Sequence, residues 1–346
     1  MARMNRWLAS AAAAASLPLL RRLDPERAHD LGLAGLRWLQ PLWPELKVGE
    51  SLAVTCAGLR FSHPLGLAAG FDKNGDCIDA LGALGFSHLE LGTVTPRPQP
   101  GNSKPRMFRI RAADALVNRM GFNNAGVDHL AARVAASPYA GIRGISIGKN
   151  ADTPLDTAES DYVACLRKVH GIADYVAVNV SSPNTARLRE LQGREGLERI
   201  VGALLEERSA LATRDGRRVP LFVKIAPNLD DGQIGTLADT LRSLGVDGVI
   251  ATNTSNDLAA LGVDWPEAHR GGLSGAPIHA LSVAVIRKLR AALGPGFPII
   301  GVGGVMSAQD AIAKRQAGAD LVQIYTGLIY EGPALVPACA QALKTA

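Results

Sequence analysis

The sequence has few cysteines and no obvious set of metal ligands. It contains four cysteines, Cys56, Cys77, Cys165 and Cys339, and no two of them form a Cys-x-x-Cys pair. A disulfide scaffold is therefore not indicated, and a reducing compartment is expected. The seven histidines are dispersed and include no His-Glu-x-x-His motif, so no metal site is expected.

Two common nucleotide-binding motifs are also missing. No Gly-x-Gly-x-x-Gly follows an expected strand, and no Gly-x4-Gly-Lys-Ser/Thr occurs. Neither a Rossmann nicotinamide site nor a P-loop is supported. The chain has 346 residues, of which 47% are hydrophobic and 20% charged. This globular composition suits one α/β barrel with additions as well as two domains.

The net charge is concentrated at the N-terminus. The formal net charge of the chain is +5. Residues 1–23 contain four arginines and no acidic residue, so they carry +4, and residues 24–346 carry the remaining +1. A nucleic-acid-binding protein would carry its positive charge over the body. No nucleic-acid partner is therefore expected.

The run Trp7–Leu20 is apolar, rich in alanine and flanked by arginines. It is shorter than the ~20 residues that cross a bilayer. It suits a secretory signal peptide, a mitochondrial-type transit segment or a helix on a membrane surface. Arg21-Arg22 stands where a signal peptide has a small-residue cleavage site, and the one-sided positive charge favours the surface helix.

A second short helix is expected next. Asp24-Pro25 supplies an N-cap and a proline at the first helical position, and apolar residues recur at helical spacing up to Pro41. Residues 1–42 are therefore predicted to be a helical segment for membrane association, and residues 43–346 the main domain. Packing of both helices on that domain as ordinary core helices is the alternative.

From residue 50 onward, expected strands and helices alternate. A small hairpin is expected at Leu52–Phe61, and helices separate most of the strands that follow. Strands are expected at Leu65–Gly70, His88–Val94, Gly144–Gly148, Tyr175–Val180, Pro220–Ala226, Gly248–Thr252, Pro298–Val302 and Leu321–Tyr325. Eight alternating units predict an α/β fold, a (β/α)8 TIM barrel with an N-terminal helical extension. A doubly wound sheet is the alternative.

The stretch Tyr175–Asn184 begins as an apolar strand and then turns polar. In parallel α/β folds, the carboxyl ends of strands carry the chemistry. An ordinary Ser/Pro turn would explain this stretch alone, but nearly every other expected strand also ends in polar or glycine-rich residues.

Glycines follow the seventh and eighth expected strands, at Gly301–Gly304 and Gly327. Backbone N–H groups at this place are the recurrent phosphate site of the barrel fold, which favours flavin mononucleotide (FMN). Lys224 lies in an apolar strand and needs an anionic partner, which reduced flavin would supply. Lys73 follows the first strand and suits a substrate carboxylate; a solvated loop charge is the alternative.

Ten segments together resemble the class 2, quinone-dependent dihydroorotate dehydrogenases. They are AAGFDKNG at 68–75, GTVTPRPQPGN at 92–102, NRMGFNNAG at 118–126, IGKN at 147–150, NVSSPNT at 179–185, VKIAPN at 223–228, ATNT at 251–254, GGLSG at 271–275, GVGG at 301–304 and VQIYTG at 322–327. The resemblance covers essentially the whole chain. Class 1 members carry cysteine at the position of Ser182 and lack the N-terminal extension.

The resemblance implies a flavoprotein oxidoreductase that oxidises (S)-dihydroorotate to orotate through one FMN per chain, with a quinone as acceptor, in pyrimidine (UMP) biosynthesis. Ser182 would be the catalytic base. The implied substrate-binding residues are Lys73, Asn118, Arg119, Met120, Gly121, Phe122, Asn179, Asn184, Asn253 and Thr254. The implied FMN-binding residues are Ala69, Gly70, Phe71, Asp72, Lys73, Thr93, Asn150, Asn179, Lys224, Thr252, Gly275, Gly304, Tyr325 and Thr326.

The resemblance also gives the extension a role. His29, Arg109 and Tyr325 would line a quinone tunnel, although His29 by itself reads equally well as a helix-surface histidine. We expect a monomer attached peripherally to the cytoplasmic face of a bacterial inner membrane, which the short leader favours, with the mitochondrial inner membrane as the alternative. Two other functions compete: a tRNA-reducing flavin barrel, suggested by the basic pI, and a non-catalytic membrane-binding barrel, which would not need Ser182 and Lys73.

Overall fold

Eight parallel strands close into a barrel in the computed structural model, which describes residues 12–42, 52–185, 187–262 and 265–344. The strand order around the barrel is β10-β12-β13-β3-β4-β7-β8-β9. Their bounds are β3 (Leu65–Leu67), β4 (His88–Val94), β7 (Ile142–Ile147), β8 (Tyr175–Asn179), β9 (Leu221–Ile225), β10 (Gly248–Ala251), β12 (Ile299–Val302) and β13 (Leu321–Ile324). The predicted barrel is confirmed, and the doubly wound sheet is excluded.

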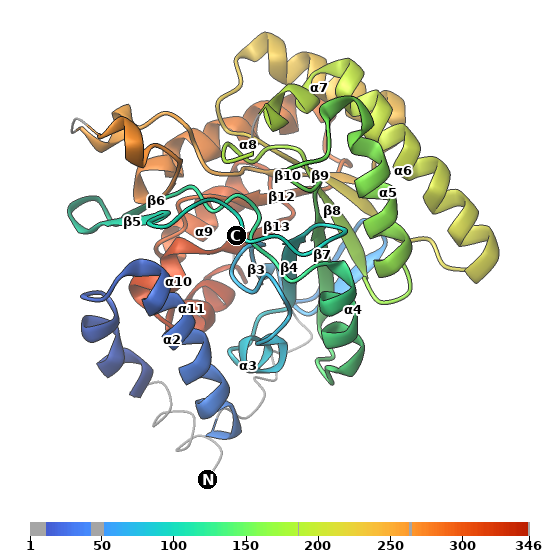
Figure 1. The fold of residues 1–346 in the computed structure, drawn as a ribbon. Coiled ribbons are helices and arrows are strands. Elements are labelled where there is room, and N and C mark those ends of the chain that lie inside the picture. The colour runs from blue at the N-terminus through green and yellow to red at the C-terminus, as the bar shows by residue number, and fades with distance from the viewer. Residues whose placement is uncertain (1–11, 43–51, 186, 263–264, 345–346) are drawn as a thin grey trace.

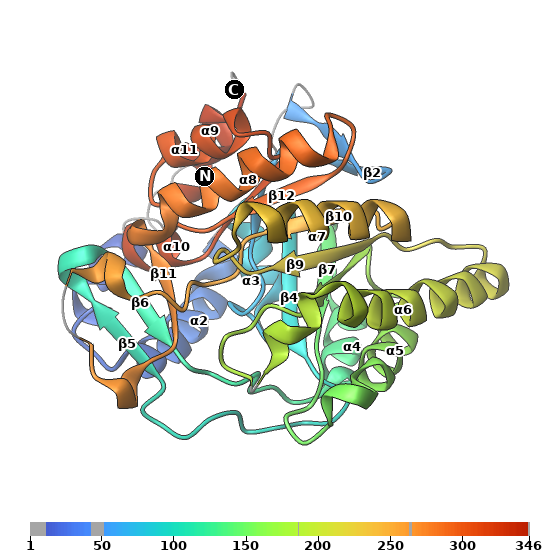
Figure 2. The ribbon, with the colours of Figure 1, turned by 90° about the horizontal axis from the view of Figure 1, so that it is seen from above.

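Helices cover the outside of the barrel (Figures 1 and 2). They are α3 (Ile78–Ala83), α4 (Val127–Ala136), α5 (Ala158–Val169), α6 (Arg194–Asp215), α7 (Asp231–Leu244), α8 (His279–Leu293), α9 (Ala308–Gln316), α10 (Thr326–Glu331) and α11 (Leu335–Ala342). Every residue of β4, β8 and β9 is buried, because the helices shield one face and the barrel interior the other. This explains why these strands consist mainly of apolar residues.

Helix α7 illustrates how local sequence sets the helix ends. The Asp230 side chain accepts a hydrogen bond from the backbone N–H of Gln233 at 2.8 Å, and the Gln233 side chain accepts one from the backbone N–H of Asp230 at 3.0 Å. This reciprocal pair is a capping box. Gly245 ends the helix in the left-handed region, at φ 70°, where glycine carries no Cβ penalty.

A three-stranded antiparallel sheet lies beside the barrel and was not predicted. It consists of β5 (Met107–Ile110), β6 (Ala115–Asn118) and β11 (Gly272–Gly275), with β6 in the centre. Residues of β6 and β11 form part of the wall of the cavity described below. The predicted hairpin is present as β1 (Val54–Cys56) and β2 (Leu59–Phe61).

The N-terminal part contains a helical stretch at residues 12–20 and helix α2 (Pro25–Leu39). The predicted N-cap of α2 is confirmed, since the Asp24 side chain accepts a hydrogen bond from the backbone N–H of Arg27 at 3.0 Å. None of the helices in the described ranges combines the length and apolar character that a bilayer crossing requires. The predicted run from Trp7 lies partly outside the described residues.

An ion pair fastens α2 to the barrel. Arg106, which precedes β5, is 7% exposed, and its guanidinium lies 2.7 Å from the carboxylate of Glu26 in the first turn of α2. The guanidinium of Arg109 in β5 donates to the backbone carbonyls of Arg21 and Leu23 at 2.9 and 3.1 Å. The turn between the two N-terminal helical stretches is therefore held by side chains of the barrel domain.

Candidate active site

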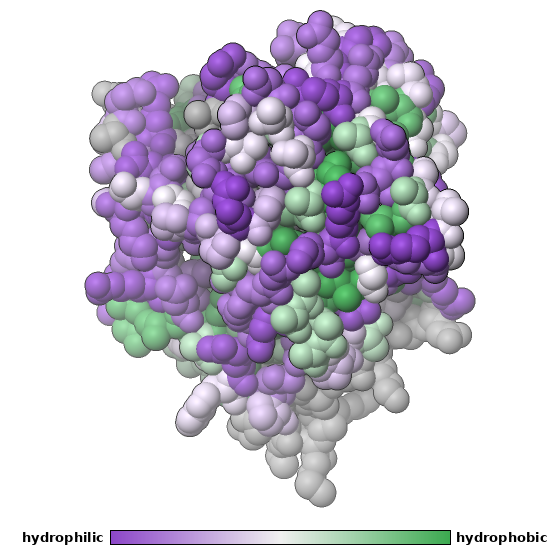
Figure 3. Space-filling view, turned by 45° about the vertical axis from the view of Figure 1, so that its right-hand side comes forward, coloured by the Kyte–Doolittle hydropathy of each residue, from purple (hydrophilic) through white to green (hydrophobic). Residues whose placement is uncertain are grey.

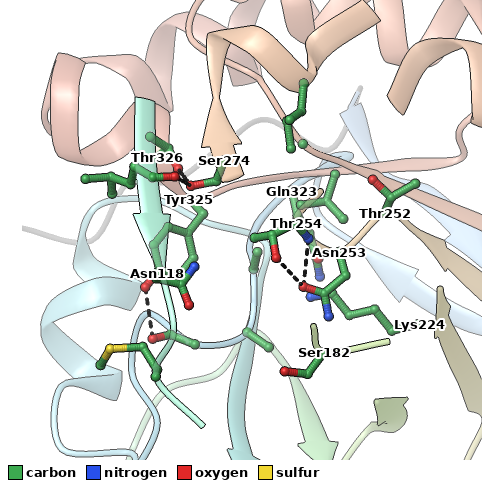
Figure 4. A pocket seen from close by; sticks show the side chains of 18 of the residues that line it. Asn118, Ser182, Lys224, Thr252, Asn253, Thr254, Ser274, Gln323, Tyr325 and Thr326 are labelled. Carbon is green, nitrogen blue, oxygen red and sulfur yellow. Dashed lines mark hydrogen bonds between the residues drawn. The ribbon is translucent and has the colours of Figure 1, made fainter. Parts of the chain in front are cut away.

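A cavity lies at the carboxyl ends of the barrel strands. Figure 4 shows Asn118, Ser182, Lys224 and Asn253 around one space. Most of the predicted site residues line it: Ala69, Gly70, Lys73, Thr93, Asn118, Met120, Gly121, Phe122, Asn179, Ser182, Asn184, Lys224, Thr252, Asn253, Thr254, Gly275, Gly304, Tyr325 and Thr326. Strands far apart in the sequence thus bring these side chains into one wall, where we expect the chemistry of a barrel enzyme.

Ser182 lies in the segment after β8, where the chain leaves the barrel. It is buried and lines the cavity. Its Oγ accepts a hydrogen bond from the backbone N–H of Asn184 at 3.2 Å. A donor on this oxygen favours a state in which the hydroxyl has given up its proton, so the geometry suits proton transfer.

Two groups of hydrogen-bonded asparagine side chains line the cavity together with Ser182. Asn179 donates from Nδ2 to Thr93 Oγ1 at 2.8 Å, and Asn253 donates from Nδ2 to Asn179 Oδ1 at 3.3 Å. In the second group, Asn184 donates from Nδ2 to Asn118 Oδ1 at 3.0 Å. Each amide carries both donors and acceptors, so these neutral side chains suit a planar ligand with carbonyl and N–H groups.

Lys73 supplies positive charge to the cavity. Its Nζ donates to the backbone carbonyl of Gly70 at 2.9 Å. Burial lowers the pKa of the Lys73 ammonium to about 8, and the nearby Glu26 carboxylate offsets part of that effect. An ammonium held by one carbonyl keeps donors for an anionic group, such as the carboxylate of a small ligand.

Lys224 has an acidic partner inside the protein that the sequence analysis missed. The Lys224 Nζ lies 3.6 Å from Glu90 Oε1, and both side chains are buried. We expected a bound anion to supply this partner. The sequence did contain a sign of this pairing, namely the Glu90 carboxylate within the otherwise mainly apolar strand HLELGTV. In a closed barrel, inward-facing charged groups of different strands can lie close to one another.

Two glycines shape the end of the cavity near β11 and β12. Gly275 and Gly304 have φ of +98° and +69°, and a Cβ there would lie 2.2 Å from the carbonyl oxygen of Asp114 and 2.5 Å from the backbone nitrogen of His279. Only glycine fits at either position. Such a backbone can approach a phosphate closely and offer it N–H donors.

Unpartnered polar atoms also point to a bound ligand. Within the described part of the chain, the buried Thr252 Oγ1 and Gln323 Oε1 have no hydrogen-bond partner, and both residues line the cavity. Leaving such atoms unpaired is costly. Together with the glycines, they fit a flat cofactor that has polar edges and one phosphate.

Arg189 is a further site residue that sequence reasoning missed. It is half-buried, and burial lowers the pKa of its guanidinium. Its Nε donates to the Ser181 carbonyl at 3.1 Å and its Nη2 to the Thr254 carbonyl at 2.8 Å. It therefore joins the loops that follow β8 and β10. Its sequence context, LRELQG, gave no sign of this.

Four of the predicted substrate- and FMN-binding residues do not line this cavity, namely Phe71, Asp72, Arg119 and Asn150. The Asp72 carboxylate accepts from backbone N–H groups at the start of α3, at 2.9 and 2.8 Å. The Asn150 amide donates to Thr95 Oγ1 at 3.1 Å. Asp72 and Asn150 therefore support the loops behind the wall, and their predicted ligand contacts stay predictions.

A second, apolar cavity of about 500 Å³ lies between the N-terminal helical stretches and the barrel. His29 and Arg109 of the predicted tunnel line it, together with Phe71, whereas Tyr325 lines the first cavity. Burial lowers the pKa of the His29 imidazole to about 4, so this ring is neutral at physiological pH.

Aromatic rings connect the two cavities. The centroids of His29 and Phe71 lie 5.1 Å apart, and those of Phe71 and Tyr325 lie 5.3 Å apart, both in edge-to-face geometry. Met107 and Leu116 line both cavities. The two spaces are therefore neighbours that share part of one wall.

Comparisons with known proteins agree on one family. The family profile described as dihydroorotate dehydrogenase matches residues 51–346. A "Dihydroorotate dehydrogenase (quinone)" from Verminephrobacter eiseniae is 56% identical over 337 residues, which cover 94% of this chain and 93% of that protein. One of the same description from Leptothrix cholodnii is 54% identical over 336 residues, covering 94% and 97%.

Solved structures are similar as well. The dihydroorotate dehydrogenase of Eimeria tenella in complex with ferulenol matches with a TM-score of 0.83 and 35% identity, over 95% of this chain and 93% of that one. The ligand-free form of that protein matches with a TM-score of 0.81 and 36% identity, over 92% and 94%.

Proposed function

Because the chain belongs to the dihydroorotate dehydrogenase family, we propose that the two neighbouring cavities divide its reaction between them. The enzyme oxidises dihydroorotate to orotate, a step of pyrimidine biosynthesis, with a quinone as the electron acceptor. One observation carries the proposal. Ser182, Lys73 and the asparagines line the same cavity, at the carboxyl ends of the barrel strands, as Gly275 and Gly304.

We propose that this wall holds one FMN per chain. Gly275, Gly304 and Thr326 would hold its phosphate, and Thr252 and Lys224 the polar edge of its ring; the unpartnered Thr252 hydroxyl supports this fit. When bound, FMN supplies the hydride acceptor for dihydroorotate and the electron donor for the quinone. Asp72 and Asn150 do not line the cavity, and would support the loops that carry the FMN-binding residues.

Dihydroorotate would lie between Lys73 and the asparagines. The Lys73 ammonium suits its carboxylate, and the amides of Asn118, Asn179, Asn184 and Asn253 suit the carbonyl and N–H groups of its ring. Ser182 would remove the proton at C5 while hydride leaves C6. The neighbouring Thr254, Met120, Gly121 and Phe122 would close the wall around the ring, and Arg119 continues the same segment.

The quinone would enter through the apolar cavity. Leucines of the N-terminal helices, including Leu17, Leu20 and Leu36, line it and suit an isoprenoid tail. His29 and Arg109 offer polar groups to the quinone oxygens, and Tyr325 lies on the side of the first cavity. The residues that line both cavities, Met107 and Leu116, support direct electron transfer from one cavity to the other.

The same helices would attach the protein to a membrane surface. Leu19, Leu31 and Trp38 are 63%, 54% and 88% exposed, whereas the face in Figure 3 is mainly hydrophilic, with hydrophobic residues in small separate groups. Exposed apolar residues beside arginines suit a peripheral helix on anionic lipid. We propose a monomer on the cytoplasmic face of a bacterial inner membrane, with residues 1–42 as the attachment segment.

An absorption spectrum and an acceptor panel test the proposed function. Purified protein should be yellow, should be bleached by dihydroorotate without oxygen, and should reduce a soluble ubiquinone analogue. A colourless protein, or one that dihydroorotate does not reduce, would refute the proposal. Equal activity with fumarate or NAD would assign the chain to the class 1 enzymes instead.

Deletion of residues 1–42 tests the membrane segment. The truncated protein should keep FMN and its reduction by dihydroorotate, should lose most quinone turnover, and should no longer sediment with lipid vesicles. A truncated protein that still sediments would contradict the attachment role.

A further inference from the structure

Four strands of the barrel contribute a buried polar layer beneath the active-site cavity. Glu90 comes from β4, Tyr175 from β8, Lys224 from β9 and Gln323 from β13. Each is at most 5% exposed. Lys224 and Gln323 line the cavity, and Glu90 and Tyr175 do not. Glu90 therefore lies behind Lys224 as seen from the ligand.

Hydrogen bonds hold the Glu90 carboxylate in place. The Tyr175 hydroxyl and the Gln323 Nε2 both donate to Glu90 Oε2, at 2.9 and 2.8 Å. The other oxygen, Oε1, faces the Lys224 ammonium at 3.6 Å and has no hydrogen bond within the described residues. Burial and the Glu90 charge raise the pKa of the Tyr175 phenol well above its ordinary value, so Tyr175 remains a donor.

The position of Glu90 changes what a ligand in the cavity experiences. Charges interact more strongly in a dry interior than in water, so the carboxylate behind Lys224 cancels part of the ammonium's field in the cavity. The layer as a whole is neutral, whereas Lys224 alone would present a full positive charge to the polar edge of a cofactor.

We propose that Glu90 is a charge-balancing residue that limits how strongly Lys224 stabilises the reduced, anionic form of the bound flavin. The inference rests on the proposed function, since it needs FMN in this cavity. Two electrons enter the flavin with the hydride of dihydroorotate, and two leave it for the quinone. Glu90 changes neither number. It keeps the electrons available to the quinone because its negative charge offsets the positive charge of Lys224 in the cavity.

The variant Glu90→Gln tests the proposal, because it removes the charge and keeps the shape. The measurement is the reduction potential of the bound FMN, obtained from its spectrum against a reference dye without substrate or quinone. The equilibrium constant for two-electron reduction should rise at least tenfold, which is about 30 mV for such a couple. An unchanged or lower potential overturns the proposal.

Tyr175→Phe is the matched control. It removes one hydrogen bond from the same carboxylate and leaves the charge, so its potential should move by less than half as much. An equal shift in both variants would trace the effect to disturbance of the layer and would also overturn the proposal.

A second pair of variants covers the case in which Glu90→Gln does not fold. Lys224→Met leaves the negative charge of Glu90 without the positive charge of Lys224. The double variant Glu90→Gln with Lys224→Met removes both charges, and a protein core tolerates the loss of both partners better than the loss of one. The double variant should favour the reduced flavin at least tenfold more than Lys224→Met does; equal potentials contradict the proposal. Wild-type protein without FMN would refute the proposed function and this inference together, whereas bound FMN with an unmoved potential refutes the inference alone.

Discussion

Ser182 shows at the level of one residue how much its surroundings must do for the proposed reaction. A serine hydroxyl is a weak base, because it must lose its own proton before it can accept one. In this protein the hydroxyl is buried and its oxygen accepts the backbone N–H of Asn184. That donor would help the oxygen to carry negative charge during proton transfer.

The variant Ser182→Ala should keep its FMN spectrum and lose turnover. General-base catalysis contributes about 10²- to 10⁴-fold, so turnover at neutral pH should fall by a factor in that range. Steady-state rates with a quinone acceptor measure this. Ser181→Ala, which removes the adjacent hydroxyl, should lose far less. A normal rate for Ser182→Ala would remove serine from the role of base.

Lys73 should make ligand affinity depend on pH. The pKa of its ammonium is lowered to about 8 by burial, so the charge that attracts a carboxylate is complete below that pH and is lost as the pH rises through it. Binding of orotate to the oxidised enzyme, followed by the flavin spectrum, should therefore weaken above about pH 8. Lys73→Arg should bind orotate without this weakening. Constant wild-type affinity up to pH 10 would contradict the assignment.

Site residues that belong to a local sequence motif could be predicted from the sequence. Contacts between side chains of strands that are distant in the sequence could not. Ser182 and Asn184 directly follow a strand, so their place at the cavity could be inferred. The pairing of Glu90 with Lys224 joins β4 to β9 across the barrel, and only the closed barrel sets which inward side chains face each other.

At the level of elements, apolar runs located all eight barrel strands, because each is shielded on both faces. The sheet of β5, β6 and β11 was missed for a different reason. Its central strand β6 pairs with β11 through residues such as Leu116 and Ser274, which lie far apart in the sequence. No local pattern encodes such a pairing.

Arg189 links two active-site loops and should therefore affect both turnover and substrate affinity. Hydrogen bonds from a charged donor contribute about 1.5–3 kcal/mol each, and Arg189→Met removes two of them. We expect kcat to fall at least tenfold and KM for dihydroorotate to rise. Arg187→Met is the control, since the Arg187 side chain is 73% exposed and pairs only with the surface residue Glu190 among the described residues. Equal effects of the two variants would contradict the linking role.

At the level of the whole molecule, charge and exposed apolar side chains are unevenly distributed. The excess of arginine lies in residues 1–23 of the sequence, and the exposed Leu19, Leu31 and Trp38 belong to the two N-terminal helical stretches. The remainder of the chain is close to neutral. The molecule therefore has one end suited to an anionic lipid surface.

Membrane binding should accordingly depend on lipid charge and on salt. The protein should sediment with vesicles that contain anionic lipid more than with zwitterionic vesicles, and 0.5 M salt should weaken the difference because it screens surface charges. Arg22→Glu should reduce binding several-fold. Arg214→Glu, a charge reversal at an exposed position on α6, should not. Binding that ignores both lipid charge and Arg22 would refute an electrostatic contribution.

The shared wall of the two cavities, with Met107 and Leu116 in both linings, has a pharmacological consequence. An apolar inhibitor bound among the leucines of the N-terminal helices would compete with the quinone. It would not block the binding of dihydroorotate. The potency of such an inhibitor would depend on the side chains that line the apolar cavity. Compounds that bind there, without contacting Ser182 or the substrate, would therefore distinguish closely related enzymes.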